Sequence, residues 1–345
     1  MGIDITLYPE KASRKELRNY ILSLNFEKAR AILDWPTGTL TYSWFEYDDF
    51  KSITGISVNI YPTLKEELDI TGNEWSLHFR ALIHASWYDR EMLNNTLRGA
   101  RKLFGGKFYG DYGINRYIPL GNDNSTPISR GISRFYENIL LKIQSIKHSL
   151  PEPIIKSSHI TDKSLREFTE AMDPSRIIYN ALIPFNVAII EYFFSNIFKV
   201  LIKYDEYAIE NLRKYNKKIK VDFLELLELT SKEKTPEDII MNMYTFQNLN
   251  QINQAYKDWL KIDIKKILIK KEKIGNSWKY LFNSLNEIVE IRHKIVHSLE
   301  LNSKLSKKDY LNSLEIIEKV IVNIVKFLEK KYNFQADSFY LPSFQ

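Results

Sequence analysis

The sequence predicts a chain of two parts, an α+β N-terminal half followed by an all-helical bundle. Up to about residue 150, segments with alternating apolar residues are mixed with helical ones, whereas after Pro174 the apolar patterns have helical spacing. With 345 residues, 44% of them hydrophobic, the chain is large enough for two cores. We expect an α+β domain at 1–150, a linker at 151–174, a helical bundle at 175–335 and a C-terminal tail at 336–345.

Composition excludes several classes of protein. The absence of cysteine removes disulfides, thiol nucleophiles and thiolate metal sites, and suits a reducing cytoplasm. Residues 1–4 show no basic region followed by an apolar run, so we expect no signal peptide. The apolar stretch 177–202 is interrupted by polar residues and by Pro184, which favours a buried helix over a membrane span. We therefore expect a cytoplasmic protein, whose net charge of +6 permits a polyanionic partner.

The N-terminal half contains strands and helices. Its first 35 residues have two short helical patterns. Three later segments alternate apolar and polar residues, the pattern of a strand with one buried face: 40–45, 55–60 and 75–86. A helix then begins at Asp89 as N-cap and ends at Gly105, and another runs from about Ser133 to Ser149.

Aromatic residues, glycines and two cations are interleaved between Lys107 and Tyr117. Bases could stack on these tyrosines, and Arg116 could contact a phosphate. A tight loop whose tyrosines fill the sheet edge explains the same composition. Both interpretations stay open, and Arg116 is a weak candidate for nucleic-acid contact.

The C-terminal half is predicted to be a bundle of four or five helices. The first, 175–204, is apolar almost all round, so its lone carboxylate, Glu191, needs a partner. Residues 261–273 interleave lysines with isoleucines and a leucine, which indicates an amphipathic segment with a solvated edge, a partner helix or a phosphate-facing patch. Lys270 and Lys271 are candidates for the patch. The last two helices begin near Asn276 and at Ser306.

The stretch Glu290–His297 has the residues for phosphodiester chemistry. The guanidinium of Arg292 presents a planar fork of donors to phosphate oxygens. His297 can transfer a proton at neutral pH, because histidine side chains in water have a pKa of about 6.5. RNA brings its own nucleophile, the 2′-hydroxyl. These two groups could therefore cleave RNA without a metal, leaving a cyclic phosphate and a 5′-hydroxyl.

Helical spacing predicts how these groups are arranged. At about 100° per residue, Arg292 and His297 lie about 140° apart, whereas His293 and His297 share a face. A pair such as Arg292 and His297 that is divided between two faces of a helix suits a helix–helix dimer interface. There the two-fold axis supplies the same residues from the second chain. Lys294 is a weak candidate for phosphate contact.

Two other interpretations of the stretch stay open. His293 and His297 have the spacing of metal ligands on a helix, and Glu290 could be the third ligand. The metalloprotease motif, however, requires Glu at the position of Lys294. Alternatively, Arg292 and the histidines make structural hydrogen bonds in a module without catalysis.

Arg292-His293-x3-His297 resembles the Arg-polar-x3-His motif of the HEPN superfamily. The long apolar helix around Glu191 and the final long helix resemble the same family, over about 175–335. The resemblance implies a metal-independent endoribonuclease with no cofactor. It implies that Arg292, His293 and His297 are catalytic, with Glu191 supporting Arg292 or a histidine.

The resemblance also implies partners. These domains usually form homodimers with two motifs facing each other, and many are toxins or effectors in bacterial toxin–antitoxin, abortive-infection and other anti-phage systems. A non-catalytic HEPN-like interaction module is the alternative. The N-terminal half resembles no family we recognise, and by analogy we expect it to bind a trigger or an inhibitor.

Overall fold

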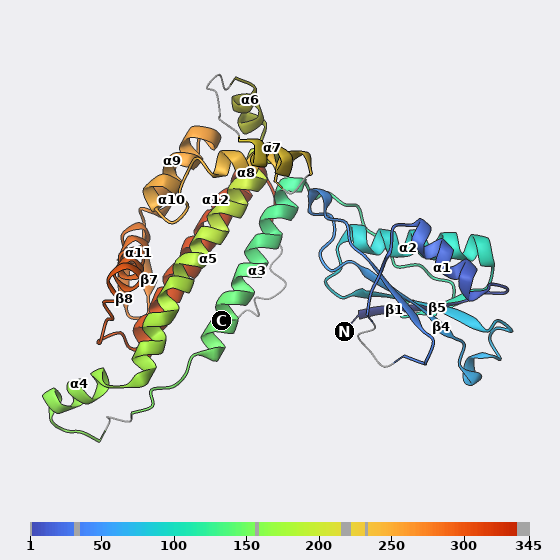
Figure 1. Cartoon of the computed structure of the whole chain (residues 1–345), viewed down its shortest axis with the longest axis horizontal. Helices are drawn as coiled ribbons and strands as arrows, with labels where there is room; N and C mark the ends of the chain where they lie inside the picture. Colours follow the sequence, from blue (N-terminus) through green and yellow to red (C-terminus); the bar gives the residue numbers. More distant parts are fainter. Residues whose placement is uncertain (1, 31–34, 156–158, 215–221, 232–233, 337–345) are drawn as a thin grey trace. The chain divides into compact units, whose positions relative to one another are not determined.

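The computed structural model describes residues 2–30, 35–155, 159–214, 222–231 and 234–336. It divides into two compact units, Met1–Ser125 and Thr126–Gln345 (Figure 1). Each unit has its own cluster of buried apolar side chains. The N-terminal unit combines a sheet with helices and the C-terminal unit is mainly helical, which confirms the predicted fold class.

The N-terminal unit is built on a six-stranded sheet with antiparallel neighbours in the order β2-β3-β4-β5-β1-β6. Its strands are β1 (Gly2–Tyr8), β2 (Glu27–Lys28), β3 (Leu40–Trp44), β4 (Ile56–Pro62), β5 (Trp75–Leu82) and β6 (Lys107–Gly110). Strands β3, β4 and β5 confirm the three predicted strands. The helical prediction for the first residues was wrong, because Ile3, Ile5 and Leu7 alternate with polar residues and fill one face of the sheet.

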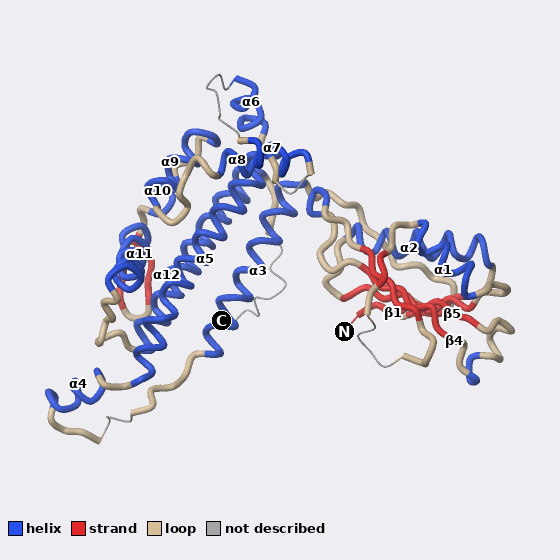
Figure 2. Tube along the Cα trace, in the orientation of Figure 1, coloured by secondary structure: helices blue, strands red, loops and turns tan. Residues whose placement is uncertain are grey.

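Two helices, α1 (Arg14–Ser23) and α2 (Trp87–Phe104), lie on the same face of this sheet (Figure 2). Two short 3-10 helices, η1 (Asp48–Phe50) and η2 (Lys65–Glu67), lie in the loops. The N-cap of α2 is Ser86 and not Asp89. The Ser86 hydroxyl accepts a hydrogen bond from the Asp89 N–H, and the Asp89 carboxylate accepts one from the Ser86 N–H. Gly105 ends α2 as predicted, with a φ of 65°.

The opposite face of the sheet carries polar side chains, among them the partly buried His78. His78 Nε2 lies 3.1 Å from Asp4 Oδ1. Arg80 and Glu67 are the other charged groups that act on this imidazole. Burial lowers the pKa of His78, since desolvation outweighs the opposing effect of Asp4. The neutral imidazole is therefore the stable form in the folded unit.

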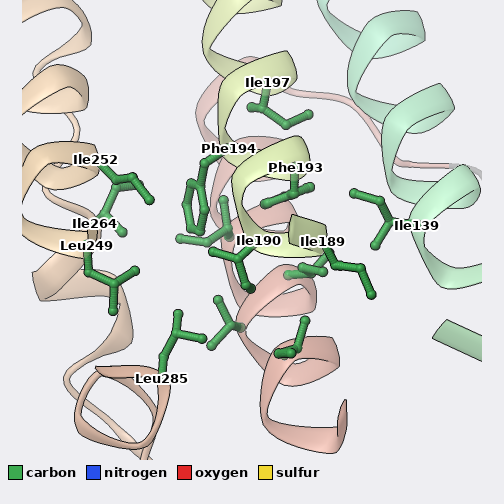
Figure 3. Packing of buried hydrophobic residues seen from close by; sticks show 14 of the residues in the cluster. Ile139, Ile189, Ile190, Phe193, Phe194, Ile197, Leu249, Ile252, Ile264 and Leu285 are labelled. Carbon is green, nitrogen blue, oxygen red and sulfur yellow. The ribbon is translucent and has the colours of Figure 1, made fainter. Parts of the chain in front are cut away.

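The C-terminal unit is a bundle around one long helix, α5 (Pro174–Tyr204). The other helices are α3 (Pro127–Ser149), α4 (Lys163–Ala171), α6 (Glu206–Lys214), α7 (Phe223–Thr230), α8 (Pro236–Met241), α9 (Leu249–Leu260), α10 (Ile264–Leu268), α11 (Leu281–Ser298) and α12 (Lys307–Tyr332). Figure 3 shows Ile190 and Phe194 of α5 pointing toward Leu249 and Ile252 of α9, while Ile139 of α3 points toward α5.

Helix α5 is apolar and long enough, by length and composition alone, to cross a membrane. In the structure it packs against α3, α9, α11 and α12, and its buried side chains include Phe193, Phe194 and Phe198. It is the core helix of a bundle, as the polar interruptions predicted. Pro184 lies inside this helix, which continues through it.

The domain boundary lies earlier than predicted. Helix α3 packs against α5 and α12, with Ile139 and Ile143 fully buried, so it belongs to the bundle and not to the N-terminal half. The boundary is therefore at Ser125–Thr126 instead of about residue 150. The predicted linker contains α4, and its residues 156–158 lie outside the described residues, as does the predicted tail beyond Ala336.

A β-hairpin interrupts the region predicted to be helical throughout. Strands β7 (Lys271–Ile274) and β8 (Ser277–Tyr280) form a two-stranded antiparallel sheet. Gly275, with a φ of 52°, and Asn276 form the two-residue turn that favours hairpins. The amphipathic helix predicted for 261–273 therefore ends at Leu268 of α10, and α11 begins at Leu281 instead of near Asn276.

Buried polar side chains join α5 to α12. The Tyr310 hydroxyl donates to Asn186 Oδ1 at 2.8 Å, and Asn186 Nδ2 donates to Ser313 Oγ at 2.8 Å. Asn186 is completely buried, so each of these groups needs its partner. The network fixes the register between the two longest helices of the unit.

Candidate functional site

The predicted site residues lie on the C-terminal half of α11, which packs against α5 and α12. Its buried stripe contains Leu281, Leu285, Ile288 and Ile295. Arg292 falls in the same stripe, one turn after Ile288, and is half-buried. Its aliphatic stem can lie along the bundle while the guanidinium reaches toward its edge.

The two histidines lie on another side of α11 and are exposed. Their ring centroids are 4.5 Å apart, as expected for side chains four residues apart. The helix continues to Ser298 and ends at Leu299, whose φ is 52° and whose N–H donates to the Lys294 carbonyl. Because no distortion occurs between Arg292 and His297, these two side chains do not converge within one chain.

The three site side chains lack structural partners. Within the described part of the chain, Arg292, His293 and His297 make no side-chain hydrogen bond or ion pair, apart from the contact between the two rings. A half-buried guanidinium without a carboxylate is suited to an external anion. This arrangement differs from the structural interpretation, in which these groups would make hydrogen bonds within the fold.

The loop after α11 is held by the beginning of α5. Asn180, which is 1% exposed, donates to the Asn302 carbonyl at 3.0 Å and accepts from the Asn302 N–H at 2.8 Å. Arg176 donates to the Ser303 carbonyl. A hollow of about 290 Å³ lies between this loop and α11, and both Lys294 and Lys304 line it. Lys294 is thus placed where a phosphate could approach the end of the motif helix.

A protein-family model described as RiboL-PSP-HEPN matches residues 136–330, more than half of the chain. The chain belongs to this HEPN family. The match begins inside α3, which agrees with the corrected domain boundary, and it does not cover the N-terminal unit. Neither a curated protein nor a solved structure matches the chain significantly.

Glu191 does not contact the HEPN motif in the structure. It is half-exposed on α5, and its Oε1 accepts a hydrogen bond from Gln247 Nε2 at 3.4 Å. Among the described residues it makes no ion pair with Arg292, His293 or His297. The lone carboxylate that the sequence singled out is therefore satisfied by an amide and by solvent.

The other candidates for nucleic-acid contact are dispersed. Lys270 Nζ lies 3.4 Å from Glu272 Oε1. The Lys271 ammonium lies 4.9 Å from the ring centre of Tyr280. Arg116 is exposed in the N-terminal unit, after β6. Of the weak candidates, only Lys294 lies on the motif helix.

The loop around Arg116 is mainly structural. The Asn115 N–H donates to the Phe108 carbonyl at 2.8 Å, and Asn115 Oδ1 accepts from the Phe108 N–H at 3.1 Å. Tyr117 packs on Phe108 with ring centroids 4.9 Å apart. These contacts support the interpretation that this loop closes the sheet edge, while Arg116 itself stays exposed.

A metal site on the motif is not assembled in the structure. Across the described residues, no three His, Asp or Glu side chains are grouped to hold a metal ion. Glu290 is exposed and lines a separate hollow of about 510 Å³ together with Glu287 and Lys294, and neither histidine contributes to it. The metal-binding interpretation of Glu290, His293 and His297 therefore gains no support.

Sequence reasoning missed two features of this region. The role of Asn180 in holding the loop after α11 depends on a contact between residues 122 positions apart. Trp278 falls within the helix that was predicted to begin near Asn276, but it lies exposed on β8. The Gly275–Asn276 pair between two short runs was the signal for the hairpin.

Proposed function

We propose that the chain is a metal-independent endoribonuclease that cleaves RNA through attack of its own 2′-hydroxyl. The observation that carries the proposal is the half-buried Arg292 together with two exposed histidines on another side of the same helix, all without a hydrogen-bond or ion-pair partner in the described fold. Membership of the HEPN family, which includes ribonucleases, supports the same chemistry.

The proposed reaction needs one cation and two proton transfers. The 2′-oxygen attacks phosphorus while an imidazole accepts its proton, the P–O5′ bond breaks, and a second imidazole protonates the 5′-oxygen. Arg292 stabilises the charge that develops on the non-bridging oxygens. His297 is the primary proton-transfer group and His293 orients or assists it. The products are a 2′,3′-cyclic phosphate and a 5′-hydroxyl.

The geometry favours a site shared by two chains. Arg292 and His297 point to different sides of α11, so a two-fold homodimer would let Arg292 of one chain face His297 of the other. Apolar side chains around the motif support an interface, since Val296 is 44% exposed and Leu299 83% exposed. Helix α4 and its C-cap residue Met172 add an exposed apolar stripe made by Leu165, Phe168 and Met172.

The same exposed apolar side chains would also serve the alternative function, a non-catalytic dimerisation or interaction module. In that case the unpartnered Arg292 and histidines would have no role in cleavage. An activity assay separates the two functions.

We assign the proposed ribonuclease to bacterial anti-phage defence, as a toxin or effector of an abortive-infection or toxin–antitoxin system acting in the cytoplasm. The resemblance of the motif supports this role. The N-terminal unit would bind the trigger or inhibitor. Its separate core supports independent folding, and its polar sheet face around His78 and Arg80 offers hydrogen-bonding groups to a ligand.

The proposal is tested by incubating purified full-length chain with RNA in excess chelator and analysing the product ends. Wild type should release cyclic phosphate and 5′-hydroxyl ends, and both Arg292→Ala and His297→Ala should not. His148→Ala, which removes another exposed histidine of the same unit, is the matched control and should cleave like wild type. Undiminished cleavage by His297→Ala would refute the mechanism.

If none of the purified proteins cleaves, expression in cells distinguishes a restrained nuclease from a binding module. Growth arrest by wild type but not by His297→Ala supports the nuclease. Equal growth of cells that express wild type and cells that express His297→Ala supports the interaction module.

A further inference from the structure

The β7–β8 hairpin presents one basic and aromatic face to solvent. Its register pairs Lys271 with Tyr280 and Lys273 with Trp278. Directly paired residues point to the same side of a sheet, and alternate residues do so along each strand. Trp278 is 68% exposed and Tyr280 46% exposed. The two rings lie two residues apart on one strand, so they form a small apolar patch that a ligand can reach.

The other face of the hairpin is fixed on α12. Ile274 is 1% exposed, and Glu272 Oε1 accepts from Asn323 Nδ2 at 3.4 Å. At the turn, the Gly275 N–H donates to Glu315 Oε2 at 3.1 Å. These contacts hold the hairpin against the bundle, so its outer face has a defined orientation.

Charge distinguishes between the ligands that this face could bind. Residues 270–280 contain four lysines and one acidic residue, Glu272. Glu272 already pairs with Lys270 and Lys319, whereas Lys271 and Lys273 have no ion pair in the described part of the chain. Lysine is depleted in protein–protein interfaces. Cations interleaved with exposed rings are typical of surfaces that bind single-stranded nucleic acid.

The hairpin is joined directly to the motif helix. The Leu281 N–H donates to the Lys270 carbonyl at 3.3 Å and closes the base of the hairpin. At 1.5 Å per residue, Arg292 lies about 17 Å along the helix axis from Leu281. The exposed Glu287 and Glu290 lie between them, so the hairpin is a separate contact and not part of one continuous basic track.

We propose that the outer face of the β7–β8 hairpin binds single-stranded RNA, with Trp278 stacking on a base and Lys271 and Lys273 contacting the flanking phosphates. This inference rests on the proposed ribonuclease function and narrows its substrate to unpaired RNA, because the bases of a duplex are stacked inside the helix and are not accessible to the indole. The contact holds the strand while the motif on α11 cleaves it.

The test measures binding of a short fluorescent single-stranded RNA of mixed sequence to full-length His297→Ala protein, so that cleavage does not interfere. Trp278→Ala should weaken binding about 5- to 100-fold, as expected for the loss of one base–aromatic stack. Trp278→Phe should stay within about 3-fold of the parent, since it keeps a stacking ring. Phe223→Ala is the matched control, because Phe223 is 73% exposed but has the acidic neighbours Glu225 and Glu228.

The lysines and the strandedness of the RNA are tested separately. A plot of log affinity against log salt concentration has a negative slope. Lys271→Gln and Lys273→Gln should each make this slope less negative by about 0.7, the value for one lost phosphate contact on a single strand. Binding of a duplex with the same sequence should not depend on Trp278. Circular dichroism checks that the variants fold.

Three results for Trp278→Ala would overturn the inference. The first is an unchanged affinity for the single strand, and the second is a loss of affinity for the duplex as large as that for the single strand. The third is a change in oligomeric state without a change in RNA affinity. The last result would identify the hairpin as a protein contact. Cleavage by wild type is recorded independently. Trp278-dependent binding without cleavage in vitro and without growth arrest on expression in cells rejects the ribonuclease and keeps the hairpin contact. Cleavage without Trp278-dependent binding rejects the hairpin contact alone.

Discussion

Mixing two inactive variants tests whether the site is shared between chains. Arg292→Ala and His297→Ala should each be inactive as homodimers. In a mixed two-fold dimer, one site would have an intact Arg292 from one chain and an intact His297 from the other, and the second site would have neither. The mixed dimer should therefore regain activity that both parents lack.

The expected recovery follows from the geometry of α11. Because Arg292 and His297 lie about 140° apart on a regular helix, they converge poorly on one ligand within one chain, which favours a site shared by two chains. Random pairing of equal amounts makes about half of the dimers mixed, and each keeps one of its two sites. The mixture should thus have about one quarter of the wild-type activity, and purified mixed dimer about one half.

The assay co-expresses the two chains with different affinity tags, isolates the mixed dimer by two successive tags, and measures RNA cleavage in chelator. The control pairs each variant with a second copy of itself under the same tags. Activity of the mixed dimer no greater than that of the controls would refute a site formed by Arg292 of one chain and His297 of the other.

Three further predictions follow from the contacts in the bundle and the sheet. Asn186→Ala should lower the free energy of unfolding by about 2 kcal/mol, because two buried hydrogen bonds are lost and the Tyr310 hydroxyl keeps only a 3.5 Å contact with the Leu182 carbonyl. A destabilisation smaller than that of Tyr310→Phe in urea denaturation would contradict this. Glu191→Gln should cleave RNA like wild type, since Glu191 bonds Gln247 and not the motif; loss of cleavage with an intact fold would restore its supporting role. Burial lowers the pKa of His78, so the unfolded chain binds this proton first, and the stability of the N-terminal unit should fall as the pH drops below about 6.5. Denaturation of full-length protein at several pH values checks this. If the stability of His78→Asn fell as steeply with decreasing pH, groups other than His78 would be responsible for the pH dependence.

Much of the fold was contained in local sequence patterns. Alternating apolar residues identified β3, β4 and β5, and the long apolar run identified α5 as the core helix, since these periods follow directly from strand and helix geometry. The motif residues were found because their chemistry and spacing are visible in one short stretch of α11. The same spacing already predicted that Arg292 and His297 point to different sides.

The errors came where tertiary contacts decide the outcome. The sequence placed α3 with the strands that precede it, but only packing against α5 and α12 shows where its apolar face is buried. Hairpin β7–β8 was assigned to helices because a lysine–isoleucine run is compatible with both periods, and its contacts with α12 favour the strand form.

The sequence by itself determined the proposed chemistry: it contains an arginine and two histidines of the types that bind phosphate and transfer protons, and it places them on one helix. Only the tertiary structure decided that Arg292 is half-buried and makes no ion pair with any described residue, that Glu191 bonds Gln247 instead, and that Trp278 lies exposed beside lysines. The physical reason is that reactivity and helical spacing are local properties, whereas burial and partnership depend on which distant segments pack together.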